Sequence, residues 1–213
     1  MGAVTSDGTM RLRNDQIGAA AELCARAFLN TPHVAYFFPV EPTRMQKTVE
    51  LFRMRIRYGR LYGDILTTSP DPAGLAVWIP SSKATMTLWR QMRAGGSRLY
   101  RAAGSDAVAR MTHVAEHNDR LRAKHAPGEH RFLSILAVDP AHQGRGLASR
   151  LLESALDRFD CEKIHVYAET TEAELLDFYG RFGFEAGAPS TVSGTDLAVW
   201  PLVRPPRMLE QGS

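Results

Sequence analysis

The segment that most constrains the fold is residues 132–138, whose sequence FLSILAV is almost continuously apolar. Such a run is typical of a strand that is buried on both faces of a sheet. Asp139-Pro140 ends the run, and apolar residues then recur at helical spacing from Leu147 to Phe159. A doubly buried strand that leads through a short turn into an amphipathic helix predicts an α/β fold, with helices packed on a central sheet.

The rest of the chain is predicted to supply more strands and helices. Short apolar or alternating runs predict strands at residues 10–13, 61–68, 73–79, 164–168 and 197–203. Helical spacing predicts a helix capped by Asn14 or Asp15 that ends near residue 28, and further helices at 43–58 and 172–182. These elements predict a sheet of mixed direction.

Residues 81–128 are predicted to form a helical insert between two halves of the sheet. The pattern leaves open whether this insert shapes a substrate pocket or only packs. The turn Ser69–Pro72 separates two strands that are expected to pair. Since no linker interrupts the pattern, we expect a single domain over residues 1–213 that contains the insert.

Composition narrows the class of protein. Hydrophobic residues make up 44% of the 213 residues and charged residues 23%, as in ordinary soluble globular proteins. Cys24 and Cys161 match no metal-ligand spacing, the first residues lack the apolar core of a signal peptide, and no apolar run is long enough for a membrane span. The sequence therefore predicts a cytoplasmic protein with no metal, no membrane association and no disulfide.

Basic residues cluster in one predicted helix, while the net charge of the chain is only +3. Such a cluster is compatible with nucleic-acid binding, but we interpret it as the solvated face of a helix, with no nucleic-acid partner. The residues are Arg44, Lys47, Arg53, Arg55, Arg57 and Arg60.

The turn at residues 143–148, with the sequence QGRGLA, joins the buried strand to the amphipathic helix. The first N–H groups of a helix have no internal partner, and the helix dipole makes that end positive, so a diphosphate is stabilised there by backbone donors. Gly144 and Gly146 carry no side chain that would block close approach, and Arg145 adds charge at the rim. Considered alone, the Gly-x-Gly pattern favours a strand-to-helix turn that binds nothing.

Two motifs give the turn a family context. Residues 136–148, LAVDPAHQGRGLA, resemble motif A of the GNAT superfamily of acyltransferases, with Gln143, Gly146 and Ala148 at the defined positions of Gln/Arg-x-x-Gly-x-Gly/Ala. Residues 178–184, FYGRFGF, are similar to motif B, the Tyr-x-x-x-Gly-Phe signature. A strand is predicted between the two motifs, as in that family.

The resemblance implies a fold and an activity. It implies a mixed, mostly antiparallel central sheet with a splayed pair of parallel strands and helices on both faces. It also implies an N-acetyltransferase that moves an acetyl group from acetyl-CoA, as cosubstrate, to a primary amine of a small molecule, by direct attack in a ternary complex. The insert and the segments 77–80 (VWIP) and 169–171 (ETT) look most like the puromycin N-acetyltransferase group.

The resemblance also assigns the cofactor contacts. The pantetheine arm is expected along the buried strand, on backbone groups of Leu136 and Val138, and the pyrophosphate on the amides of the turn. The full set of predicted cofactor residues is Leu136, Ala137, Val138, Gln143, Gly144, Arg145, Gly146, Leu147, Ala148 and Ser149. One departure concerns Leu175, which stands where the puromycin-type group usually carries an asparagine that touches the cofactor arm.

The predicted catalytic residues are Tyr179 and Glu169. Tyr179, the tyrosine of motif B, is the family's candidate acid for the leaving thiolate, because a phenol stays protonated at neutral pH. The N–H of Val138 is the expected donor to the oxyanion. Glu169 is predicted to follow the strand 164–168 and to serve as general base. Glu129, His130 or an ordered water are alternatives for the base.

Other functions are weighed against this one. Gly144-x-Gly146-x-x-Ser149 approaches the fingerprint of a dinucleotide-binding oxidoreductase, but its third glycine is missing and too few strands follow. A domain that binds acetyl-CoA and only senses it is the non-enzymatic alternative. The sequence names no acceptor amine, and it leaves the oligomeric state open, a homodimer included.

Overall fold

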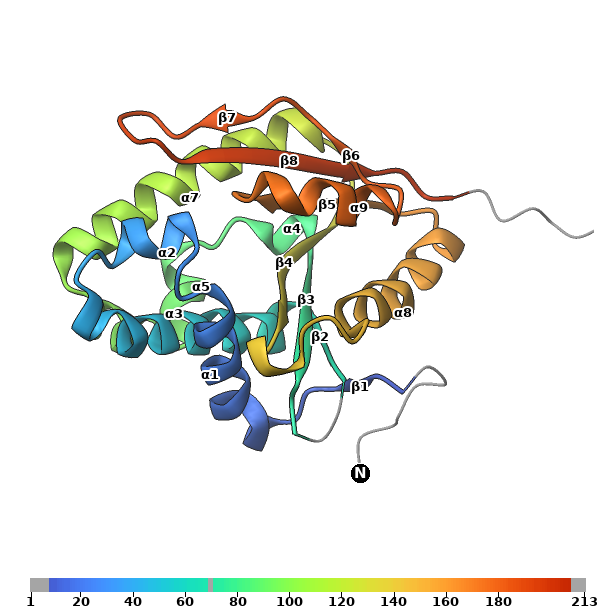
Figure 1. The fold of residues 1–213 in the computed structure, drawn as a ribbon. Coiled ribbons are helices and arrows are strands. Elements are labelled where there is room, and N and C mark those ends of the chain that lie inside the picture. The colour runs from blue at the N-terminus through green and yellow to red at the C-terminus, as the bar shows by residue number, and fades with distance from the viewer. Residues whose placement is uncertain (1–7, 69–70, 208–213) are drawn as a thin grey trace, which may run out of the picture.

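The computed structural model of the chain describes residues 8–68 and 71–207, so residues 69 and 70 of the predicted turn lie outside it. A mixed sheet dominates the molecule (Figure 1). Its strands run in the order β1-β2-β3-β4-β5-β8-β6, with β7 also paired to β8. They are β1 Met10–Arg11, β2 Asp64–Thr67, β3 Gly74–Pro80, β4 His130–Val138, β5 His165–Thr170, β6 Glu185–Ala186, β7 Ser190–Thr191 and β8 Ala198–Arg204.

Helices cover both faces of the sheet. One core cluster lies between the sheet and α8, while a second, larger cluster lies between the opposite face and α1, α3 and α7. The helices are α1 Ile17–Phe28, α2 Pro32–Phe37, α3 Glu41–Tyr62, α4 Ser81–Ala84, α5 Leu88–Arg93, α6 Gly96–Ala103, α7 Ser105–His125, α8 Leu147–Cys161 and α9 Leu176–Gly180, with 3₁₀ turns at Asn14–Gln16 (η1), Pro140–His142 (η2) and Ala173–Leu175 (η3). Within the described ranges, no helix combines the length and the apolar character needed to cross a bilayer.

Strand pairing confirms the predicted fold class. Among the described strands, β4 and β5 form the parallel pair and the other pairs are antiparallel. The predicted stripe on α8 is buried against the sheet, at Leu151, Leu152, Ala155, Leu156 and Phe159. The chain thus has the mixed, mostly antiparallel sheet with helices on both faces.

Several predicted boundaries are wrong, each for a local reason. The strand expected from Leu61 begins at Asp64, because α3 continues to Tyr62 and ends at Gly63. At Gly63 an added Cβ would lie 2.1 Å from the carbonyl oxygen of Trp78, so the chain passes from helix to strand where only glycine fits.

The predicted cap at Asn14 or Asp15 is also wrong. α1 is entered through η1, where the Arg13 N–H donates to the Gln16 side chain at 2.7 Å, and Asn14 instead accepts hydrogen bonds from Arg60. The short helix α2 was not predicted. The helix expected at 172–182 is divided into η3 and α9, which leaves the preceding strand β5 longer than predicted.

The parallel pair separates halfway along its length. β4 and β5 are in register over His130–Leu133 and His165–Ala168, after which β4 continues along β3 to Val138 and β5 continues along β8. The register of β3 against β4 shifts at this point, with Ser134 as the extra residue of a bulge. A bulge bends its strand and increases the local twist, and the outcome here is a gap between β4 and β5.

Candidate active site

Backbone groups of β4 face this gap. The Asp139 N–H donates to the Ala73 carbonyl at 2.9 Å, which orients the backbone of that residue toward β3. Backbone direction alternates along a strand, so the N–H groups of Leu136 and Val138 point toward the gap instead. These are the two groups predicted to bind the pantetheine arm. The same alternation turns the backbone of Ala137, the third predicted strand residue, toward β3.

The turn at 143–148 is an exposed strand-to-helix connection. Gly144 and Gly146 both have φ of +73°, a left-handed conformation that favours glycine, and an added Cβ at either would meet no protein atom within 4 Å. The first bonded amide of α8 is that of Arg150, which donates to the Gly146 carbonyl at 3.0 Å. The amides of residues 147–149 precede it and have no intrahelical acceptor. The turn therefore offers open space and backbone donors together.

Asp139 holds the bend between β4 and this turn. Its carboxylate accepts from Arg26 Nε at 2.9 Å, and from the Ala141 N–H at 3.0 Å. Burial alone would raise the pKa of Asp139, but the Arg26 guanidinium and the Ala141 N–H together bring that pKa below its ordinary value. An ionised Asp139 therefore ties the end of β4 to α1.

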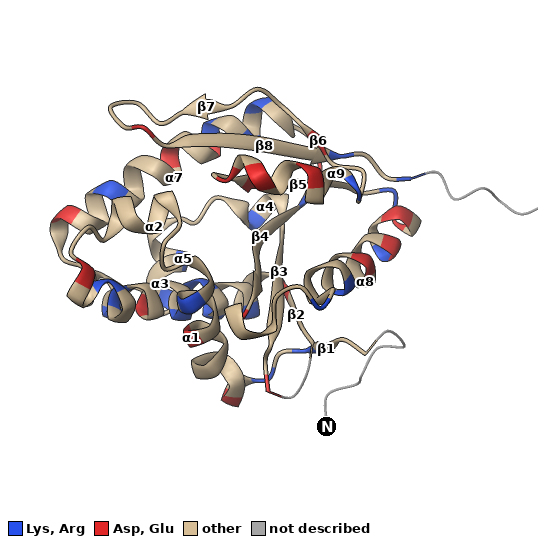
Figure 2. Ribbon diagram, in the orientation of Figure 1, with Lys and Arg blue, Asp and Glu red and all other residues tan. Residues whose placement is uncertain are grey.

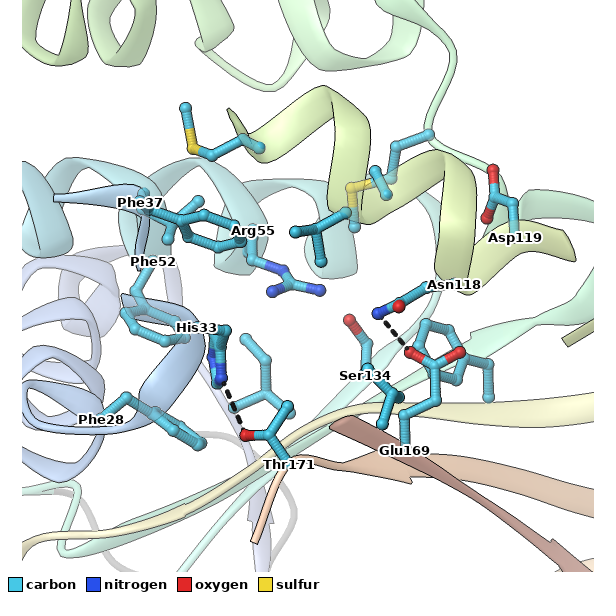
Figure 3. A pocket seen from close by; sticks show the side chains of 18 of the residues that line it. Phe28, His33, Phe37, Phe52, Arg55, Asn118, Asp119, Ser134, Glu169 and Thr171 are labelled. Carbon is cyan, nitrogen blue, oxygen red and sulfur yellow. Dashed lines mark hydrogen bonds between the residues drawn. The ribbon is translucent and has the colours of Figure 1, made fainter. Parts of the chain in front are cut away.

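A cavity of about 360 Å³ lies on the α1, α3 and α7 side of the gap. Its lining includes Phe132 and Ile135, which belong to the core on that side, and also Leu133 and Tyr179, which belong to the core under α8. Since residues from both faces of the sheet line one space, the cavity reaches the gap between β4 and β5. Its apolar wall includes the aromatic rings of Phe28, Phe37 and Phe52 (Figure 3).

Glu169 points into this cavity (Figure 3). It lies within β5, opposite Pro201 of β8, so the prediction that it follows the strand is wrong. Its Oε2 accepts from Asn118 Nδ2 at 2.8 Å, whereas Oε1 is buried and has no hydrogen-bond partner among the residues that the structure describes. Burial raises the pKa of Glu169 to about 7, against the opposing effect of Arg122. A carboxyl group that titrates near neutral pH is suited to accept a proton.

Tyr179 also lines the cavity, from α9. Its ring is buried edge-on against Phe178 and Phe184, at centroid distances of 5.3 and 5.5 Å. Its hydroxyl has no hydrogen-bond partner among the described residues. Burial and the Glu172 carboxylate raise the pKa of Tyr179, so the phenol stays protonated at neutral pH. Leu175, the departure from the puromycin-type pattern, is exposed at the cavity wall.

Arg55 is a cavity residue that the sequence interpretation missed. Basic residues occur along α3 (Figure 2). The side chains of most of the cluster bind elsewhere: Arg44 to the Phe38 carbonyl, Lys47 to the Ala103 carbonyl, Arg53 to Glu50 and Arg60 to Asn14. Arg55 instead projects its guanidinium into the cavity (Figure 3). The prediction that the cluster forms a solvated helix face is therefore wrong for this residue.

Three further polar residues of the cavity were not predicted. His33 Nδ1 lies 3.3 Å from Thr171 Oγ1, and burial lowers the pKa of this imidazole to about 4, so it is neutral. Arg122 forms an ion pair with Asp119 and lies over the Phe132 ring at 4.9 Å. Both Asp119 and Arg122 come from α7, so the segment 81–128 contributes side chains to the cavity.

The alternative bases lie away from this site. Glu129 is exposed just before β4. Nδ1 of His130, the first residue of that strand, donates a hydrogen bond to the Gly128 carbonyl at 2.8 Å. Neither residue lines the cavity. His113 bonds the Ser193 carbonyl at 2.8 Å. In the part of the chain that is described, no three His, Cys, Asp or Glu residues are grouped as metal ligands would be.

Both the sequence and the structure are similar to those of known acetyltransferases. Residues 108–186 match the acetyltransferase (GNAT) domain family. A histone acetyltransferase HPA2 and related acetyltransferase from Corynebacterium glutamicum is 18% identical, with a TM-score of 0.66 over 95% of this chain and 97% of that one. A putative arylalkylamine N-acetyltransferase 7 from the yellow fever mosquito is 13% identical, with a TM-score of 0.62 over 93% and 87%. The polyamine N-acetyltransferase of Drosophila melanogaster is 16% identical, with a TM-score of 0.57 over 92% and 98%.

These likenesses show that the chain has the GNAT acetyltransferase fold. The sheet also decides against the oxidoreductase alternative, because a dinucleotide-binding fold needs a mostly parallel, doubly wound sheet. In the described sheet, β4 and β5 form one parallel pair among antiparallel pairs.

Proposed function

We propose that this protein is an N-acetyltransferase that moves an acetyl group from acetyl-CoA to a primary amine of a small molecule. The observation that carries the proposal is the cavity that reaches the gap between β4 and β5. At the gap, the cavity borders backbone groups of β4 that are not paired with β5, and β4 continues to the exposed glycine turn. The cavity also contains the carboxyl group of Glu169, whose pKa is about 7. A thioester and an amine can thus approach each other from opposite sides of the sheet.

The chain's own residues fit acetyl-CoA as cosubstrate. Leu136 and Val138 would hold the pantetheine arm through their backbone, and the amides of the turn would hold the pyrophosphate. Gly144 and Gly146 leave the outer side of the turn free, and Arg145 is exposed beside them. When bound, the cosubstrate supplies the acetyl group as an activated thioester.

Each catalytic group has a defined task. Glu169 accepts a proton from the acceptor ammonium, directly or through a water molecule, and the free amine attacks the acyl carbon in a ternary complex. The Val138 N–H donates to the acyl oxygen as negative charge develops there. Tyr179 donates a proton to the sulfur as the carbon–sulfur bond breaks, and the second proton that the nitrogen loses as the amide forms restores the phenol. Tyr179 lines the cavity, and Val138 lies farther along β4, next to the bend that leads to the turn.

A non-catalytic sensor domain is the competing proposal, and one experiment separates the two. Release of free CoA thiol from acetyl-CoA is measured with a panel of amines that includes arylalkylamines, agmatine, amino acids and an aminonucleoside. The aminonucleoside tests the likeness of residues 77–80 and 169–171 to the puromycin-type group. Acceptor-dependent thiol release supports the enzyme, whereas stabilisation by acetyl-CoA with no release from any amine supports the sensor.

A further inference from the structure

We propose that the acceptor is an amine that also carries a carboxylate, of the amino acid class with an apolar side chain, and that Arg55 binds the carboxylate. The inference rests on the proposed function for the fate of the amine. Recognition of the carboxylate depends only on the cavity itself.

The position of Arg55 on α3 is unusual for an arginine. Leu51 and Phe52, four and three residues before it, and Tyr58 and Gly59, three and four residues after it, are all buried. Arg55 therefore occupies the core-facing side of the helix, where side chains at this spacing meet the interior. Because the cavity lies there, the guanidinium projects into it and not into solvent outside the protein (Figure 3).

Arg55 has no hydrogen bond and no ion pair among the described residues. Burial lowers the pKa of this guanidinium, which nevertheless remains charged, and the nearby Glu169 opposes the effect. A charged group with five donors in a partly desolvated position is unfavourable unless an anion satisfies it. A carboxylate matches the planar fork of a guanidinium with two parallel hydrogen bonds.

The other charged groups of the cavity do not fill this role. Asp119 is paired with Arg122, and Glu169 is held by Asn118. His33 is neutral because burial lowers its pKa to about 4. The remaining acidic lining residues are Glu116, which is exposed on α7, and Glu172, whose charge contributes to the raised pKa of Tyr179.

The arrangement fits an amphoteric ligand better than a polyamine. Arg55 enters the cavity from α3 and Glu169 enters from β5, with the Ser134 hydroxyl also directed into the space (Figure 3). An amino acid can place its ammonium at Glu169 and its carboxylate at Arg55. A polyamine would bring a second cation toward the unpaired guanidinium. The aromatic wall of Phe28, Phe37 and Phe52 favours an apolar side chain.

The test compares matched ligands that differ only in the carboxylate. Phenylalanine is compared with phenethylamine, and 6-aminohexanoate with pentylamine, by calorimetric binding to the full chain in the presence of CoA and by thiol release from acetyl-CoA. The two pairs place the amine and the carboxylate at short and long separation. We expect the carboxylate-bearing member of at least one pair to bind at least about tenfold more tightly, as a hydrogen-bonded charge pair typically gives.

Variants then assign the effect to Arg55. Arg55→Met keeps the length and helical propensity of the side chain and should remove about tenfold or more of the affinity for the amino acid, while affinity for the plain amine stays within about twofold. Arg55→Lys should restore part of it. Arg57→Met, on the same helix but exposed and outside the cavity, is the matched control and should change neither value.

Each outcome bears on the proposal. If the wild type binds both plain amines as tightly as the acids, or prefers spermidine, the proposal is wrong even if acetyl transfer occurs. It is also wrong if Arg55→Met keeps the preference for the acid. If the preference is present but no amine releases thiol, the proposed enzyme activity fails and the amino acid site stands.

Discussion

The turn that begins α8 and the cavity beside α3 are the two halves of the proposed site, and they are built in opposite ways. The turn consists of consecutive residues that act through their backbone, and two glycines with φ of +73° fix its shape. The cavity is lined by side chains that extend in sequence from Phe28 to Val199. The part proposed to bind the constant cosubstrate is thus local, whereas the part proposed to select the acceptor depends on the whole fold.

The largest effect should come from Gly146→Val, which tests the local half. A branched residue is strained at positive φ, and its side chain would occupy the space outside the turn. Acetyl-CoA at a hundredfold over Kd should stabilise the wild type by about 2.7 kcal/mol, and this variant by close to zero. Thermal unfolding with and without acetyl-CoA measures both values.

Gly194→Val provides the control for backbone strain. Gly194 has φ of +71° in a distant turn, and an added Cβ there also meets no protein atom within 4 Å. This variant should lose similar stability but keep the response to acetyl-CoA. A folded Gly146→Val protein that is stabilised like the wild type would show that the turn does not hold the cosubstrate.

The second effect concerns Tyr179, where the two halves meet. Tyr179→Phe should lower kcat by about 10- to 1,000-fold with little change in KM for acetyl-CoA, because the change removes a proton donor and keeps the ring. Tyr62→Phe is the control, because the Tyr62 hydroxyl is buried outside the cavity and has no hydrogen-bond partner in the described part of the chain. Steady-state kinetics of this variant should show no loss of kcat. An equal kcat for Tyr179→Phe and wild type would leave Tyr179 as a core aromatic residue.

The third effect lies in the cavity half. If Glu169 is the base, kcat/KM of the wild type should fall as the pH drops through about 7, since the raised pKa makes the carboxylate protonated below that value. Glu169→Gln should lower kcat/KM at neutral pH by at least about tenfold and should recover partly at high pH, where free amine is abundant. The full pH–rate profile is the measurement.

Glu116→Gln is the companion variant, because it neutralises an exposed carboxylate of the same cavity. Its profile should match that of the wild type. The role of Glu169 would be refuted by a Glu169→Gln profile that keeps both the height and the inflection of the wild type, and an ordered water would then be the base.

The smallest effect should come from the contact that joins the two halves, between Arg26 of α1 and Asp139. The Arg26 side chain is 47% exposed, so the pair should contribute only about 0.5–1 kcal/mol. The folded-state pKa of Asp139 is lowered, so this contribution is present above the ordinary aspartate pKa of about 4 and is lost as the pH falls through the lower folded value.

Urea unfolding of wild type and Arg26→Met at pH 7 and at pH 2.5 checks this expectation. The difference in unfolding free energy should be present at pH 7 and should shrink at the acid pH. A difference that is independent of pH would mean that Arg26 contributes through packing alone. Arg60→Met, which removes hydrogen bonds to the uncharged Asn14, should show no such pH dependence in this range.

The comparison also explains what the sequence could and could not predict. The buried strand, the glycine turn and the stripe on α8 are set by neighbouring residues, so their pattern was sufficient for the fold class. Glu169 was predicted to follow the strand but lies within β5, because the polar residues Glu169 and Thr170 do not continue the apolar pattern that was used to place the end of the strand.

Arg55 shows why the cavity half was harder to predict. The sequence did contain an indication that Arg55 faces the core. The residues three and four positions before and after it, which share its side of the helix, are uncharged: Leu51, Phe52, Tyr58 and Gly59. The alternating Arg53, Arg55 and Arg57 masked this signal, because the run has the composition of an ordinary solvated face. Partners such as Asn118 become visible only once α7 is packed across the sheet.

The bulge at Ser134 changes which residues of β4 face each side of the sheet. Before it, the side chain of Phe132 faces the cavity side and that of Leu133 faces α8; after it, Ile135 and Ala137 face the cavity side. Even-numbered and odd-numbered residues therefore exchange faces where the strand leaves β5. A one-residue insertion or deletion elsewhere in β4 would move this exchange of faces away from the gap. The number of residues in the strand is therefore more constrained than their identity.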